Sequence, residues 1–74
     1  MKDYYYKAVI EPQAEGGFTA YVPSLPGCVT EGETYEETMS NMKEALELYL
    51  ETLKERRRKV KPDTTHIAEL HVFV

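Results

Sequence analysis

The segment from Pro23 to Thr34, PSLPGCVTEGET, constrains the fold more than any other stretch of the chain. Its prolines and glycines interrupt regular structure, because proline lacks a backbone donor and glycine readily adopts positive φ. Thr34 and Glu37 then form a capping box, which is a typical helix start. Glu36 and Glu37 also place negative charge at the positive end of the helix dipole. The segment therefore predicts strands before it and a helix after it.

The residues that follow predict one long helix from about Tyr35 to about Arg57. Met39 and Met42 lie at helical spacing, which favours core packing over an adaptable binding groove. The basic run at 54–61, KERRRKVK, is typical of a helix end that offsets the dipole, with contact to nucleic acid or to an acidic surface as the alternatives. The apolar stripe of this helix consists of Tyr35, Met39, Met42, Ala45, Leu46, Tyr49, Leu50 and Leu53.

Four segments have the alternating pattern of strands: residues 4–11, 18–22, 28–31 and 66–74. Gly16-Gly17 suits a hairpin between the first two. The predicted order is βββαβ, which gives an α+β class: one small domain over residues 1–74, with a mainly antiparallel sheet and a helix on one face. The last strand would run parallel to the first if it lay beside it.

A single helix covers only one face of such a sheet, so the other face meets water or another subunit. The side chains expected there are too apolar for a plain solvent surface, which predicts a homo-oligomer. The predicted oligomer interface consists of Tyr5, Val9, Tyr21, Ile67 and Phe73.

Composition narrows the range of partners. The net charge of −4 argues against a nucleic-acid or membrane surface as the primary partner and suits a basic protein instead. A lone cysteine, Cys28, excludes an intramolecular disulfide and fits a reducing compartment. No signal peptide or membrane span is recognisable in the sequence, so we expect a cytoplasmic protein.

The chemistry-bearing residues do not form a recognisable catalytic or metal-binding motif. A histidine near Cys28 would be needed to activate its thiol, and His66 and His71 alternate to opposite faces of a strand. One of them can still approach Cys28, but a small buried cysteine and two ordinary strand histidines are the favoured interpretation. Carboxylate pairs occur at Glu31/Glu33 and Glu36/Glu37, and those in the helix are explained by capping and the helix dipole. We therefore expect no enzyme, no metal and no cofactor.

The run PSLPGCVTEGETYEET followed by NMKEALELYLE resembles the HicB family of type II antitoxins. The hallmark of that family is a P-D-L-P-G-C stretch, then G-D/E-T and a helix with E-A and A-L-x-x-Y elements. The resemblance extends over the whole chain, including a Tyr-rich first strand and the GGF hairpin. Ser24 replaces the usual Asp and Thr38 the usual Ala. Because the chain stops at Val74, we expect no C-terminal DNA-binding domain and regard direct DNA binding as doubtful.

The resemblance implies a partial RNase H-like domain without the nuclease's catalytic acids. It implies that the chain binds and neutralises HicA, a small, basic, RNA-cleaving toxin. Two alternatives remain: a stand-alone homo-oligomeric binding protein without a toxin, and a residual RNA-binding or nuclease activity. The turn prolines and the acids can equally serve only to shape the turn and cap the helix. The predicted partner-binding residues are Pro23, Ser24, Leu25, Pro26, Glu31, Glu33, Glu36 and Glu37.

Overall fold

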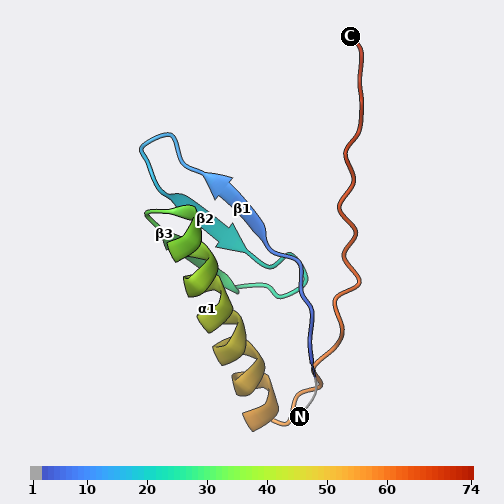
Figure 1. Cartoon of the computed structure of the whole chain (residues 1–74). Coiled ribbons are helices and arrows are strands. Elements are labelled where there is room, and N and C mark those ends of the chain that lie inside the picture. Colours follow the sequence, from blue (N-terminus) through green and yellow to red (C-terminus); the bar gives the residue numbers. More distant parts are fainter. Residues whose placement is uncertain (1–2) are drawn as a thin grey trace.

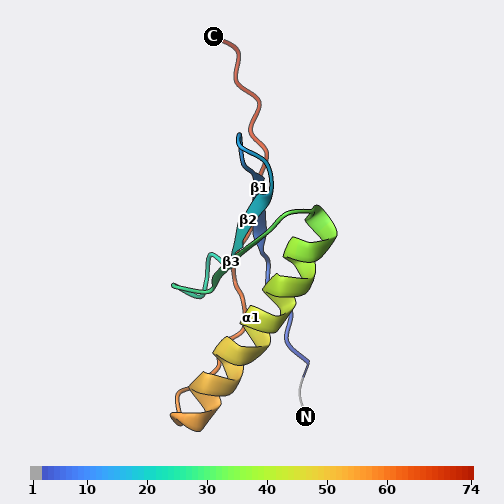
Figure 2. The same cartoon turned by 90° about the vertical axis from the view of Figure 1, so that its left-hand side faces the viewer.

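The computed structural model describes residues 3–74 as a three-stranded sheet with one long helix on one face (Figures 1 and 2). The strands are β1 (Val9–Pro12), β2 (Phe18–Tyr21) and β3 (Val29–Gly32), and the helix α1 spans Tyr35–Glu55. All neighbouring strands are antiparallel, in the order β1-β2-β3. The predicted α+β class, with an antiparallel sheet and one covering helix, is confirmed.

The turn between β1 and β2 depends on its two glycines. Gly16 and Gly17 have φ of 103° and 78°, and the Gln13 N–H closes the turn by donating to the Gly17 carbonyl at 2.9 Å. A Cβ at Gly17 would also lie 2.9 Å from the carbonyl oxygen of Gly32 on β3. Gly17 is therefore required by both its backbone angle and its neighbour.

The strand register separates the two faces of the sheet. Ile10 pairs with Ala20, which pairs with Thr30, and this row faces the helix, since Ala20 is only 1% exposed. The adjacent row, Val9–Tyr21–Val29, lies on the face that the helix leaves uncovered. Two of the five residues predicted for an oligomer interface, Val9 and Tyr21, are thus direct cross-strand neighbours on that face.

Helix α1 begins at the predicted cap. The Thr34 hydroxyl accepts a 3.0 Å hydrogen bond from the Glu37 N–H, and the helix ends at Glu55, slightly before the predicted Arg57. Of the two methionines in the helix, Met42 is buried and Met39 is 43% exposed, so only Met42 is a full core residue. The buried core consists of Ala20, Val22, Cys28 and Met42.

Helix α1 approaches strand β3 closely at Gly32 and Thr38. Thr38 is completely buried, and its hydroxyl donates to the Thr34 carbonyl at 2.7 Å. A Cβ on Gly32 would lie 2.6 Å from the Thr38 hydroxyl oxygen and 2.8 Å from its backbone nitrogen. Gly32 therefore permits the first turn of α1 to pack directly on β3.

The ends of the described chain differ most from the prediction. The first strand begins at Val9 rather than at residue 4, and the preceding Tyr6 and Lys7 bond to Lys61 and Asp63 of the segment after the helix. Residues 66–74, predicted as the last strand, are extended but have no strand partner within the described part of the chain (Figure 1). The alternating pattern favoured an extended backbone, whereas a strand also requires hydrogen bonds to a neighbouring strand. The order is thus βββα within one chain, and the predicted final β element is not formed there.

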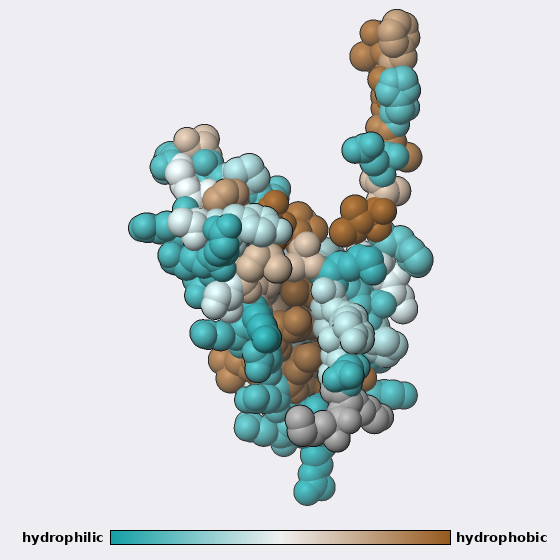
Figure 3. All heavy atoms as spheres, in the orientation of Figure 1, coloured by the Kyte–Doolittle hydropathy of each residue, from teal (hydrophilic) through white to brown (hydrophobic). Residues whose placement is uncertain are grey.

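The space-filling view shows where hydrophobic residues reach the surface (Figure 3). Hydrophobic atoms gather in a strip between the helix and the strands, and hydrophobic atoms also appear along the projecting C-terminal segment. Among residues 3–74, no helix is long and apolar enough to cross a membrane.

Candidate functional site: an acidic groove and an apolar groove

Four carboxylate side chains surround one hollow at the start of α1. Glu15 comes from the β1–β2 turn, Glu31 from β3, Glu33 from the connection between β3 and α1, and Glu37 from the first turn of the helix. They line a groove of about 640 Å³, here called the acidic groove. The groove brings together carboxylates that lie up to 22 positions apart in the sequence, from Glu15 to Glu37, because the β1–β2 turn lies beside the end of β3.

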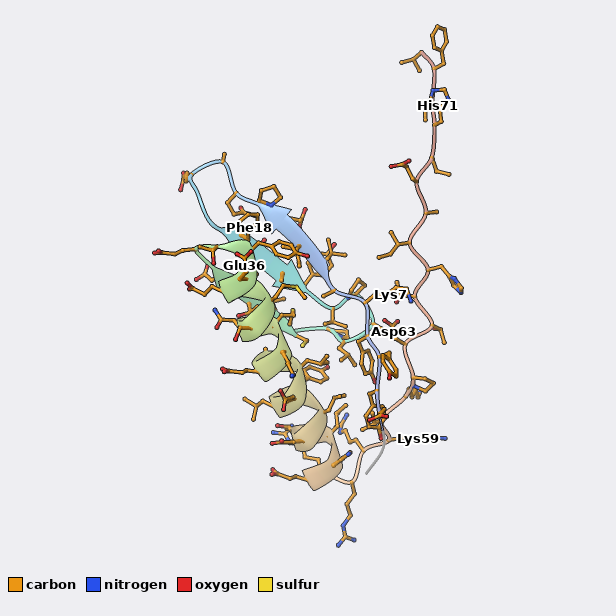
Figure 4. All side chains as sticks on the ribbon, viewed as in Figure 1. Lys7, Phe18, Glu36, Lys59, Asp63 and His71 are labelled. Carbon is orange, nitrogen blue, oxygen red and sulfur yellow. The ribbon has the colours of Figure 1, made fainter. Side chains whose placement is uncertain are left out.

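Two contacts hold the walls of the acidic groove in place. The Phe18 ring meets the Tyr35 ring edge-on, with centroids 6.2 Å apart and planes at 86°, which joins β2 to the first turn of the helix. The Asn41 side-chain amide donates to the Glu31 carbonyl at 2.9 Å, which joins α1 to β3. Figure 4 shows Phe18 close to the start of the helix, where Glu36 also lies. The carboxylates therefore stand on a fixed scaffold.

The structure assembles part of the predicted acidic set and adds one residue. Glu31, Glu33 and Glu37 line the groove, whereas Glu36 is exposed on the same helical turn without lining it. Glu15 was missed, since a turn residue shows its position relative to the helix only once the strand register is known. The glutamates that line the groove are four of the 13 acidic residues of the chain, whose net charge is −4.

The predicted turn residues lie at the other end of β3. The Leu25 N–H donates to the Val22 carbonyl at 3.0 Å, and Leu25 is half-buried against the core. The Tyr49 hydroxyl donates to the Pro26 carbonyl at 3.0 Å, which ties the turn to the middle of the helix. Pro23, Ser24 and Pro26 are exposed. The predicted partner-binding residues thus form two surfaces, one at each end of β3.

A second hollow lies beside this turn, between β3 and the C-terminal half of the helix. Its volume is about 510 Å³, and its walls include Val29, Leu48 and Leu53, with Arg56 and Arg58 also contributing. Val29 and Leu48 are 62% and 65% exposed, which is high for aliphatic residues beside a groove. This apolar groove was not predicted. The signal for it was Leu48, which lies outside the apolar stripe of the helix.

The candidate nucleophile and its candidate activators are not brought together. Cys28 is buried in the core, and this burial raises the pKa of its thiol. His66 and His71 belong to the exposed C-terminal segment, and Figure 4 shows His71 far from the sheet and helix. A buried thiol with a raised pKa carries little thiolate, so the arrangement favours a structural cysteine. Within residues 3–74, no three His, Cys, Asp or Glu side chains are grouped to hold a metal ion.

A further polar contact joins the two ends of the folded region. Asp63 accepts hydrogen bonds from the Lys7 N–H at 2.6 Å and from the Thr65 N–H at 2.8 Å. These bonds lower the pKa of the Asp63 carboxyl to about 2, because they stabilise its charged form. The Tyr6 hydroxyl donates to the Lys61 carbonyl nearby, and the Lys54 ammonium lies 5.2 Å from the Tyr4 ring centroid. Figure 4 shows Lys7 beside Asp63.

A small α+β scaffold with an acidic and an apolar groove, and with its only cysteine buried, has the features of a protein-binding module. The sequence model of the HicB-like antitoxins of bacterial toxin–antitoxin systems matches residues 6–72. The chain belongs to this HicB-like antitoxin family. Membership supports an antitoxin role and suggests a non-enzymatic one with a toxin as partner.

Relatives occur in bacteria and archaea. A UPF0150 protein of Synechocystis sp. is 35% identical over 71 residues, which cover 96% of this chain and 90% of the relative. A UPF0150 protein of Thermoplasma acidophilum is 36% identical over 66 residues, covering 89% and 96%. One from Helicobacter pylori is 58% identical over 43 residues, covering 58% of each chain.

Proposed function

We propose that this chain neutralises a small, basic, RNA-cleaving toxin of the HicA type by binding it and covering its catalytic surface. The observation that carries the proposal is the acidic groove, in which Glu15, Glu31, Glu33 and Glu37 converge from separate elements of the fold. Opposite charges on two proteins speed their association and fix their relative orientation. We place this action in the cytoplasm, where the RNA substrate of such a toxin lies.

Charge alone does not hold a complex together, because exposed ion pairs contribute little net free energy. The apolar groove supplies a second kind of contact, since Val29 and Leu48 are exposed aliphatic side chains beside a hollow. Buried apolar anchors usually dominate the energy of a protein interface. In this proposal the acidic groove orients the toxin, and the apolar groove, with the adjoining Pro23–Pro26 turn, anchors it.

The proposal assigns contacts to both ends of β3. Glu31, Glu33 and Glu37 act through the acidic groove, and Glu36 adds charge beside it. A toxin that touches both surfaces lies along β3. Such a partner would bury a continuous strip of this chain rather than a single pocket.

Co-purification with a small basic protein encoded next to this chain tests the proposal. We expect a stoichiometric complex in which added salt slows association. The double variant Glu33→Gln, Glu37→Gln should slow association, whereas the matched variant Glu44→Gln, Glu47→Gln, on the helix outside the acidic groove, should have a smaller effect. Leu48→Ala should speed dissociation. Absence of a complex with the wild-type chain, or equal effects of both glutamate pairs, would contradict the proposed binding surface.

A further inference from the structure

The C-terminal segment, residues 66–74, has the sequence of a strand but lacks a sheet. Its side chains alternate, with Ala68, Leu70 and Val72 on one side and Glu69 and His71 on the other. Every residue in it is exposed, and Leu70 and Phe73 reach 83% and 93%. Figure 1 shows it running upward, clear of β1, and Figure 3 shows hydrophobic atoms along it. An extended apolar segment of this kind is a strand that requires a partner.

The point at which this segment leaves the domain is fixed. The Asp63 carboxylate accepts hydrogen bonds from the Lys7 N–H and the Thr65 N–H. The Tyr6 hydroxyl donates one to the Lys61 carbonyl. Residues 61–65 are therefore attached beside the residues that lead into β1. Beyond Thr65 the chain contains no glycine or proline to reverse its direction.

The open edge of β1 offers backbone groups for an additional strand. Hydrogen-bonded and non-bonded residue pairs alternate along an antiparallel ladder. The Gln13 N–H donates to the Gly17 carbonyl at 2.9 Å, which fixes that alternation. Because Gln13 directs its backbone groups toward β2, Glu11 and Val9 do so too, two and four residues earlier. The backbone groups of Ala8, Ile10 and Pro12 therefore point away from β2. Pro12 fits this position, because its missing N–H removes no bond from the β1–β2 ladder.

The opposite edge of the sheet is less available. On β3 the Val22 N–H donates to the Cys28 carbonyl at 3.1 Å, so the Val29 and Glu31 backbones face outward. There the Glu31 carbonyl already accepts a bond from the Asn41 side chain, and helix α1 packs against β3 and β2. The open edge of β1 is therefore the better acceptor of a strand.

We propose that residues 66–74 of one copy of this chain add as a strand to the β1 edge of a second copy. Residues 66–74 of the second copy add in the same way to β1 of the first. In such a symmetric dimer each C-terminal segment pairs with the open β1 edge of the other copy. Both open edges and both apolar segments are therefore covered at one two-fold interface. The wholly apolar side of the added strand, with Leu70 and Val72, lies on the face of the sheet that helix α1 covers. The mixed side brings Ile67 and Phe73 to the face that carries Val9. This dimer does not depend on toxin binding.

Light scattering on the full chain, together with amide exchange, tests the proposal. We expect a dimer of about twice the 8.5 kDa chain mass, with the Ile10 N–H slow to exchange. The double variant Leu70→Glu, Val72→Glu should be a folded monomer with a rapidly exchanging Ile10 N–H. The control Leu48→Glu alters the apolar groove instead and should remain dimeric. A wild-type monomer, or a dimer that survives the Leu70/Val72 changes, would overturn the proposal.

A mixed sample distinguishes exchange between copies from folding back within one chain. Isotope-labelled and unlabelled chains are unfolded together, refolded and examined for nuclear Overhauser effects between chains. Contacts between the Ile10 region of one copy and the Leu70 region of the other support the exchange. The same contacts found only within single chains would refute it.

Discussion

The Lys7 backbone N–H donates a 2.6 Å hydrogen bond to the Asp63 carboxylate, across 56 positions of the sequence. This bond connects the residues before β1 to the segment after α1, two regions without a shared ladder. Because it depends on a carboxylate charge, it makes the attachment of the C-terminal region sensitive to acid.

The pH dependence of this attachment is the first prediction. The pKa of Asp63 falls from its ordinary 3.8 to about 2 in the folded chain, so the folded state favours the charged form. The contribution to stability is therefore fully present above about pH 4 and is lost as the pH falls toward 2. Amide exchange at Lys7 and Thr65 should accelerate through this window. In Asp63→Asn the two amides should already exchange faster at neutral pH, without this transition; a protected Lys7 amide in that variant would contradict the assignment.

Gly17→Ala should destabilise the fold more than Gly16→Ala. Both positions have positive φ, which costs an L-residue on the order of 1 kcal/mol. Only at Gly17 does the new Cβ also meet a backbone oxygen, that of Gly32, whereas at Gly16 it meets open space. We expect a loss of about 2 kcal/mol or more for Gly17→Ala and about 1 kcal/mol for Gly16→Ala, measured by urea unfolding. Equal midpoints would mean that the β1–β2 turn relaxes away from β3.

The two helix methionines provide a matched pair. Met42 is 4% exposed within the core, and Met39 is 43% exposed one turn earlier. Met42→Ala should cost about 2–5 kcal/mol, which is enough to unfold much of a chain this small. Met39→Ala should cost about 1 kcal/mol or less. Circular dichroism at the helix band with increasing urea measures both values, and similar losses would contradict the described core.

Cys28 should resist thiol reagents while the chain is folded. Its side chain is buried and its thiol pKa is raised, so both access and thiolate population are low. We expect labelling at neutral pH to follow global opening, and therefore to accelerate in Met42→Ala. Rapid modification of the folded wild-type chain would instead indicate an accessible, reactive cysteine and revive a nucleophilic role.

Much of the fold was predictable because local chemistry agrees with the final structure. The Thr34–Glu37 cap, the apolar stripe of the helix and the Gly16-Gly17 turn each depend on neighbours within a few residues. The final strand was not predictable in the same way. Its alternation favours an extended backbone, but whether an edge receives it depends on distant residues such as Asp63.

The candidate site was predictable only in part, for a similar reason. Glu31, Glu33 and Glu37 are close in sequence and were recognised as one acidic group. Glu15 joins them through the register of β1, β2 and β3, which no local pattern contains. The apolar groove is lined by Leu48 of the helix and Val29 of β3, so its walls are contributed by a helix and a strand. Sequence patterns describe each wall separately, whereas the groove exists only after packing.

The contact between Gly32 and Thr38 fixes the first turn of the helix directly against strand β3. The helix has 21 residues, which corresponds to a rod about 30 Å long. It rests on β3 at its first turn, where no space remains for even one methyl group on Gly32. We expect a larger residue at position 32 to displace the first turn of the helix, and a rigid helix would carry that displacement toward Leu53, which lines the apolar groove. We therefore expect a substitution at position 32 to alter the width of that distant groove without contacting anything bound in it.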